Sequence, residues 1–119
     1  MSKHTPGPWL VDLESSRAGD ICPQNEFDLS ICEIQRVDCS AETGRYFDGE
    51  TTEANRRLIA AAPELLAELK NLHRAYVNLL ESGRDRIVAL GGDCDPVDRM
   101  EQDDPHLRAA KAAIAKATA

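Results

Sequence analysis

Six residues near the middle of the chain have the types and spacing of an anion site. They bring an aromatic pair, three arginines and an amide together within residues 45–57: Arg45, Tyr46, Phe47, Asn55, Arg56 and Arg57. Forked guanidinium donors and the free N–H groups of a helix N-terminus stabilise phosphate, and aromatic rings stack on nucleobases. Two interpretations remain open. Either the cluster is a nucleotide-phosphate site, or the arginines lie on a solvated face while one ring packs on a sheet.

Catalysis by an activated nucleophile requires a Ser or Cys side chain beside a basic histidine. The chain contains His4, His73 and His106, and no motif places any of them next to a nucleophile. His73 falls within an apolar helical stripe, which is typical of a core or interface histidine. We therefore expect a protein that is not an enzyme and has no catalytic residues.

The residues that could bind a metal do not have metal-site spacing. The cysteines form no C-x-x-C pair, and no histidine has zinc-finger spacing: Cys22, Cys32, Cys39 and Cys94. The Asp93-x-Asp95-x-x-Asp98 segment has Pro96 where a calcium loop needs a flexible centre. We expect reduced thiols, no metal and no cofactor, and a solvated acidic connector.

The elements before residue 50 are predicted to be short strands. Residues 9–13 are apolar and follow a Pro-Gly-Pro segment, which disfavours a helix. A second strand begins at residue 21, and an alternating apolar pattern predicts a third over residues 27–31. The alternation then changes face, which indicates a β-bulge near Cys32.

The chain after residue 50 is predicted to be helical. Apolar residues recur at alternating spacings of four and three and form a heptad seam: Leu58, Ala62, Leu65, Leu69, Leu72, Tyr76 and Leu79. A second row widens the seam: Ile59, Leu66, His73 and Leu80. A face this wide requires a partner helix, and the small apolar residues of a last helix suit close packing against it. Pro63 removes a backbone donor, which predicts a kink or two abutting helices near residues 60–63.

These patterns predict an α+β fold in a single domain over residues 1–119. A small N-terminal antiparallel sheet precedes a long kinked helix and a short C-terminal helix, which form a helical hairpin that we expect to oligomerise. The predicted bounds are 1–50 for the sheet region, 51–83 for the long helix, 84–104 for the acidic connector and 105–118 for the last helix. Ser82-Gly83 is a typical helix end, and Asp104-Pro105 is a typical helix start.

Charge and hydropathy exclude several classes of partner. The chain has 119 residues, a formal net charge of -7 and no concentrated Lys/Arg face, which argues against duplex nucleic acid. No apolar run approaches the roughly 18–20 residues of a membrane-spanning helix. The first residues lack the apolar segment of an export signal. We therefore expect neither a membrane partner nor secretion, while a small anion held by two or three arginines remains compatible.

Two segments resemble a family of small proteins encoded by tailed phages and prophages: HTPGPW at residues 4–9 and ANRRLIAAAPELL at residues 54–66. In that family a strand region of variable length separates the two motifs. The resemblance implies a phage accessory protein that works in the cytoplasm of the host bacterium. The order of elements is also similar to that of the Thoeris anti-defence sponges, which bind cyclic nucleotide immune signals at subunit interfaces without chemistry.

Two functions fit these observations. In the first, a homo-oligomer sequesters an anionic cyclic nucleotide. The resemblance then implies Arg45, Asn55, Arg56 and Arg57 as phosphate ligands, with Tyr46 or Phe47 stacking on a base. In the second, the chain is an interaction module that binds a host or phage protein through its Leu-rich helix or its acidic residues 91–104.

Overall fold

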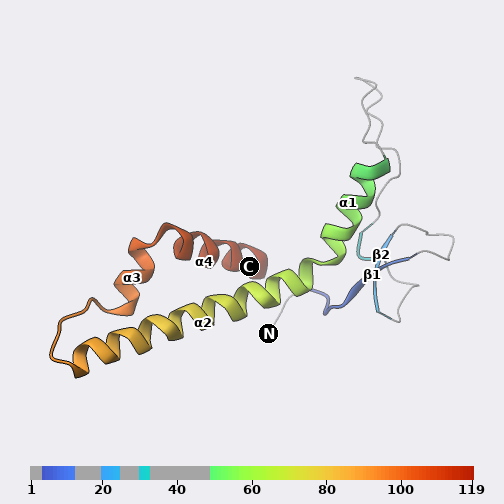
Figure 1. Ribbon diagram of the computed structural model, residues 1–119. Helices are drawn as coiled ribbons and strands as arrows, with labels where there is room; N and C mark the ends of the chain where they lie inside the picture. Colours follow the sequence, from blue (N-terminus) through green and yellow to red (C-terminus); the bar gives the residue numbers. More distant parts are fainter. Residues whose placement is uncertain (1–3, 13–19, 25–29, 33–48) are drawn as a thin grey trace, which may run out of the picture. The chain divides into compact units, whose positions relative to one another are not determined.

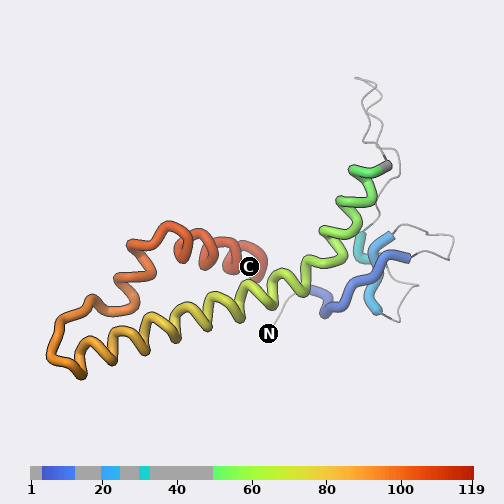
Figure 2. The backbone as a smooth tube through the Cα atoms, viewed as in Figure 1, coloured from blue at the N-terminus to red at the C-terminus, as the bar shows by residue number. Residues whose placement is uncertain are grey.

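The computed structural model describes residues 4–12, 20–24, 30–32 and 49–119. These residues form two strands and four helices (Figures 1 and 2): β1 (Trp9–Val11), β2 (Ile21–Pro23), α1 (Gly49–Ala60), α2 (Ala62–Ala89), α3 (Val97–Asp103) and α4 (Pro105–Thr118). The predicted α+β class is confirmed, since a small antiparallel sheet precedes the helices. Where a single domain is predicted, the chain divides into two compact units, Met1–Leu65 and Leu66–Ala119. Within the described ranges, no helix combines the length and the hydropathy needed to cross a membrane.

The sheet is short, and a third segment joins it by an isolated bridge. β1 and β2 are antiparallel, with Leu10 opposite Cys22, and Cys32 bridges to Ile21. The amides of Ile31 and Cys32 both donate to the Ile21 carbonyl, at N···O distances of 2.8 and 3.3 Å. Two residues opposite one is the pattern of a β-bulge, and it matches the bulge predicted near Cys32. Most of the third predicted strand lies outside the described residues.

Helix α1 packs on this sheet and encloses a small core. It contacts both strands, and Ile21 and Cys22 are completely buried. Buried polar side chains border the two apolar ones: Asp12, Asp20, Thr52 and Arg56. The Ser30 hydroxyl donates to Asp20 Oδ2 at 3.0 Å. Because a buried carboxylate requires hydrogen-bond partners, this bond ties the third segment to the start of β2.

The long helix is interrupted where the proline predicts it. α1 ends and α2 begins on either side of Ala61. The Ala61 amide still donates to the Arg57 carbonyl at 3.0 Å. Pro63 has no N–H with which to continue this pattern, and its ring crowds the preceding turn. The prediction of two abutting helices is confirmed.

The predicted end of the long helix at Gly83 is wrong, because α2 continues to Ala89. Arg and Ala residues follow Gly83 and favour a helix. The helix ends at Gly91, which has a φ of 86° and whose amide donates to the Val88 carbonyl at 3.0 Å. The Gly92 amide donates to the Ile87 carbonyl, also at 3.0 Å. This is a Schellman motif, in which the left-handed residue is best a glycine.

The connector predicted over residues 84–104 is largely helical, which corrects that assignment. Its first residues belong to α2, and α3 occupies Val97–Asp103. Arg99 lies within ion-pair distance of two carboxylates, 4.0 Å from Asp95 and 3.9 Å from Asp103. Arg99 and Asp103 have the i,i+4 spacing that supports a helix, while Asp95 precedes α3, so the acidic composition of the segment does not prevent helix formation.

Helix α4 begins at the predicted cap. Asp104 Oδ1 accepts hydrogen bonds from the amides of His106 and Leu107, at 2.8 and 3.2 Å. Pro105 takes the first helical position, where its missing N–H costs nothing. Leu107 is the one buried apolar side chain of residues 66–119, all of which the structure describes. The second unit is therefore stabilised by a thin core.

Helices α3 and α4 fold back along one face of α2 (Figure 1). Three residues of the row that widens the predicted seam are half-buried on α2, namely Leu66, His73 and Leu80, as are Leu69 of the seam itself and Val77. Along α4, Ala110 and Ile114 are half-buried as predicted, whereas Ala117 is exposed. The chain therefore supplies its own partner for part of the seam only.

Candidate binding surfaces

The structure describes three of the six residues of the predicted nucleotide site. Arg45, Tyr46 and Phe47 lie outside the described residues, while Asn55 and Arg57 are exposed on α1. Arg56 is only 7% exposed, and its Nη1 forms an ion pair with Glu53 Oε1. An anion at Arg56 would have to compete with the Glu53 carboxylate for that guanidinium. Asn55 and Arg57 are thus the described members of the predicted site that solvent reaches.

The second surface is an exposed apolar row on α2, which we call the leucine face: Leu65, Leu72, Tyr76 and Leu79. The exposed fractions of the three leucines are 54%, 68% and 67%, and that of Tyr76 is 42%. Residues at spacings of three, four and seven share one side of a helix. Single exposed leucines are common on proteins, but a contiguous exposed row of large apolar side chains marks an interaction site.

The third surface is an open cleft of about 360 Å³ within the second unit. It is lined by three basic side chains, one histidine, one carboxylate and two aliphatic residues: Lys70, Arg74, Lys111, His73, Glu101, Val77 and Ile114. Its volume lies at the small end of the range for ligand pockets, about 300–1,000 Å³. The cleft therefore gathers positive charge in a chain whose formal net charge is -7.

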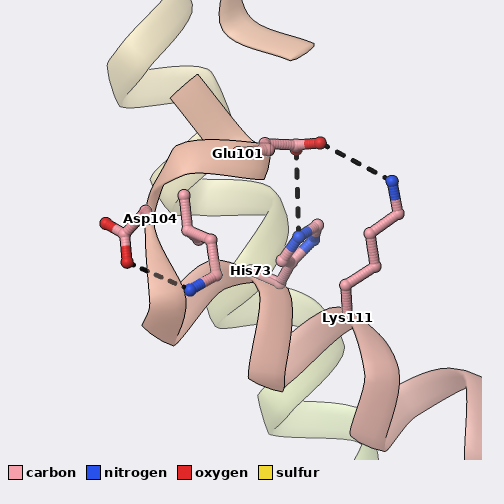
Figure 3. A network of polar contacts seen from close by, with 5 residues as sticks. His73, Glu101, Asp104 and Lys111 are labelled. Atoms are coloured by element: carbon pink, nitrogen blue, oxygen red, sulfur yellow. Dashed lines mark hydrogen bonds and ion pairs between the residues drawn. The ribbon is translucent and has the colours of Figure 1, made fainter. Parts of the chain in front are cut away.

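Glu101 organises the polar groups of this cleft (Figure 3). Its Oε2 lies 3.7 Å from Lys111 Nζ, and its Oε1 lies 3.9 Å from His73 Nε2. His73 Nε2 is buried and has no hydrogen-bond partner among the described residues. A buried ring nitrogen without such a partner is costly for the fold, and His73 lines the cleft. No group of three His, Cys, Asp or Glu side chains in the described ranges could hold a metal ion.

A family model for the Salmonella phage P22 protein Y8K6 matches residues 1–119, the whole chain. The chain belongs to this phage protein family. No curated protein matches it, and no solved structure does. The phage origin implied by the two sequence motifs is thereby confirmed, and the family description states no activity.

In this member of the P22 Y8K6 family, the two motifs contact each other. A Cβ atom placed on Gly7 would lie 2.7 Å from Pro63 Cβ and 3.2 Å from Pro63 Cγ. Real Cβ atoms do not approach so closely, so the first motif needs glycine where it meets the AAAPELL segment. Both motifs lie in the first unit, except for Leu66, the last residue of the second motif. They therefore support its local fold, whereas the cleft and most of the leucine face lie elsewhere.

The cleft was not predicted from the sequence. Lys70 and Arg74 have i,i+4 spacing and share one side of α2, which could have indicated a basic pair. Lys111 and Glu101 come from α4 and α3 and join that pair only through the tertiary fold. His73, predicted to be a core or interface residue, is half-buried beside Glu101.

Proposed function

We propose that this phage protein is a non-catalytic binding protein that holds a small anionic nucleotide in the cleft of its second unit. In the host cytoplasm it would sequester a cyclic nucleotide immune signal. The observation that carries the proposal is the convergence of Lys70, Arg74 and Lys111 on one cleft of a strongly acidic chain. The similarity of element order to the Thoeris anti-defence sponges supports the class of ligand.

The lining of the cleft suits a phosphate joined to a less polar group. Guanidinium and ammonium groups bind phosphate oxygens by charge-assisted hydrogen bonds. A phosphate would compete with Glu101 for Lys111, next to His73 in the lining of the cleft. Val77 and Ile114 supply an apolar wall against which a ribose or a base can pack.

The same lining supports binding without turnover. No Ser, Thr or Cys side chain contributes to the cleft within the part of the chain that is described. Attack on a phosphate or glycosidic bond through a covalent intermediate needs such a nucleophile. His73 and Glu101 are the groups of the cleft that could hold a water as a base, so recovery of the ligand unchanged is the test of this point. Sequestration needs only affinity and a sufficient amount of protein.

The test is native mass spectrometry of the full chain with cyclic di- and trinucleotides and cyclic ADP-ribose isomers. We expect discrete added masses at integral stoichiometry and recovery of the ligand unchanged. Lys111→Ala should weaken binding about tenfold or more, since a charged hydrogen bond contributes about 1.5–3 kcal/mol. Lys116→Ala is the matched control, because it removes the same charge from the same helix outside the cleft.

If the ligand binds at the alternative phosphate site on α1, the two sets of variants should have the opposite effects on binding. If Arg57→Ala abolishes binding and Lys111→Ala does not, the ligand occupies the site predicted around residues 45–57. If both variants bind as the parent chain does, neither site holds the ligand. A chain that takes up nothing from the panel contradicts the nucleotide proposal as a whole.

A second function is supported by the exposed leucine face. A row of leucines that the chain leaves uncovered is suited to a protein partner, as in a phage accessory module that engages a host or phage protein. Co-purification from infected cells with the parent chain and with Leu72→Glu tests this function. A partner that the parent retains and the variant loses would favour it.

A further inference from the structure

We propose that the leucine face of α2 binds the same face of a second copy of this chain, with the two helices antiparallel. The inference does not rest on the proposed function, because it concerns a surface that contributes no residue to the cleft. It follows from the exposed residues of α2, which supply both halves of a self-complementary contact.

Two exposed charges on α2 are placed to pair across such a contact. Glu68 and Arg86 are both exposed, and neither forms an ion pair within the described residues. They lie about five helical turns apart, so they emerge from the same side of α2, at the edge of the leucine face. At about 27 Å, the two charges are too far apart to interact within one chain.

An antiparallel arrangement brings these charges together across a two-fold axis. A two-fold axis midway between Glu68 and Arg86 places each glutamate opposite the arginine of the other copy. The same operation produces the contact twice, as a closed two-fold interface requires. A parallel pair would instead set Glu68 against Glu68 and Arg86 against Arg86, which is unfavourable.

The sizes of the exposed side chains on α2 also fit this arrangement. The same register sets each exposed leucine against a small exposed residue: Leu65 against Ala89, Leu72 against Ser82 and Leu79 against Ala75. Large side chains from one helix then enter spaces left by small side chains on the other, which allows close packing. Gly83 adds to this space, and a Cβ atom there would meet nothing within 4 Å in the single chain. One register therefore pairs the opposite charges and also sets large side chains against small ones.

The first measurement is sedimentation equilibrium of the full chain, without nucleotide, over a wide concentration range. We expect a monomer–dimer equilibrium that Leu72→Glu weakens about a hundredfold or more, because it buries two unpaired carboxylates in each dimer. Val88→Glu is the matched control, since it adds the same charge at an exposed apolar position of α2 on the opposite side. Circular dichroism of both variants checks that the helices remain.

The second measurement determines direction and register by exchanging the charges. Glu68→Arg alone and Arg86→Glu alone should each weaken the dimer about five- to tenfold, because attraction becomes repulsion at two symmetric contacts. The double variant should restore the parent affinity. Restoration requires residue 68 of one copy to meet residue 86 of the other, since the two are far apart within one chain.

Four results would overturn the inference. A parent chain that stays monomeric at the highest concentration excludes a self-contact of useful strength. A dimer that Leu72→Glu leaves intact uses another surface. A dimer that both single reversals weaken and the double variant fails to restore has a different direction or register. If Leu72→Ala, which preserves the helix, weakens only the capture of a different protein, that protein is the occupant instead.

Discussion

The two apolar faces of α2 differ in what covers them. On one face, Leu66, His73 and Val77 are half-buried where α3 and α4 fold back. On the other, Leu72 and Leu79 remain about two-thirds exposed. Both faces belong to one helix, and leucine is common on each. Apolar content alone therefore does not determine which face a chain buries against itself.

The difference arises from the composition of the face of α4 that packs on α2. Its covering face is made of one leucine, one isoleucine and alanines, so it is narrow and packs along a single row of α2. Glu101 fixes the choice of row, because it lies near His73 on one side and Lys111 on the other. The leucine face has no comparable polar partner in the second unit, and it remains available to another molecule.

The largest difference between the two faces is expected in the stability lost when one leucine at each face is truncated. Leu107→Ala should lower the free energy of unfolding by about 2–3 kcal/mol, since it removes the buried side chain that holds α4 in place. Leu72→Ala should change it by less than about 0.5 kcal/mol in the monomer, because that side chain is already exposed. Urea denaturation at low protein concentration measures both. Equal losses would mean that the two faces are covered alike.

A smaller effect concerns the cap that starts α4. Asp104→Ala should cost about 1 kcal/mol, because two amides of the first turn lose their acceptor. The control is Asp103→Ala, which removes a neighbouring carboxylate that forms only an exposed ion pair. If α4 covers α2 as described, thermal unfolding of the Asp104 variant should also expose the His73 side of α2 at a lower temperature. Two variants of equal stability would contradict the capping role.

Much of this fold is determined by residues that are close together in the sequence, and it could be predicted for that reason. The Pro63 interruption and the Asp104-Pro105 cap depend on residues a few positions apart, and the change of alternation at Cys32 indicated the bulge there. The end of α2 was misplaced for a local reason as well, since Gly83 and Gly91 both follow a helical segment. Only the second adopts a positive φ, and the bonds of the Schellman motif favour it by closing the last turn.

The candidate site was much less predictable, because it is tertiary. The heptad pattern indicates a wide apolar face, but it does not state which row meets α4. The cleft needs Lys70 and Arg74 from α2 and Lys111 from α4, which only the return of the chain brings together. Conversely, Arg56 has the composition of a phosphate ligand, yet burial beside Glu53 gives it a structural role. Composition identifies candidate charges, and packing decides which of them solvent can reach.

The smallest effect tests how far the leucine face extends. Arg86 lies at the edge of that face only because α2 continues past Gly83 and ends at Gly91. Alanine at these two glycines should therefore change the stability of the monomer in opposite directions. Gly83→Ala should stabilise the monomer by about 0.5–1 kcal/mol, since it lies inside a helix with open space around it. Gly91→Ala should destabilise it by about 1 kcal/mol, because its φ of 86° strains any residue with a Cβ atom.

The same pair separates the helix from its contact with a second copy. Alanine at residue 83 adds a methyl group in the space that the antiparallel register leaves for Leu72 of the other copy, so the gain in monomer stability should accompany a weaker dimer. Alanine at residue 91 lies beyond the end of α2 and should leave the dimer affinity nearly unchanged. Unfolding at low concentration and sedimentation at high concentration measure the two quantities independently. A Gly83→Ala variant that is less stable as a monomer would mean that the helix ends at residue 83. Arg86 would then not lie at the edge of the leucine face.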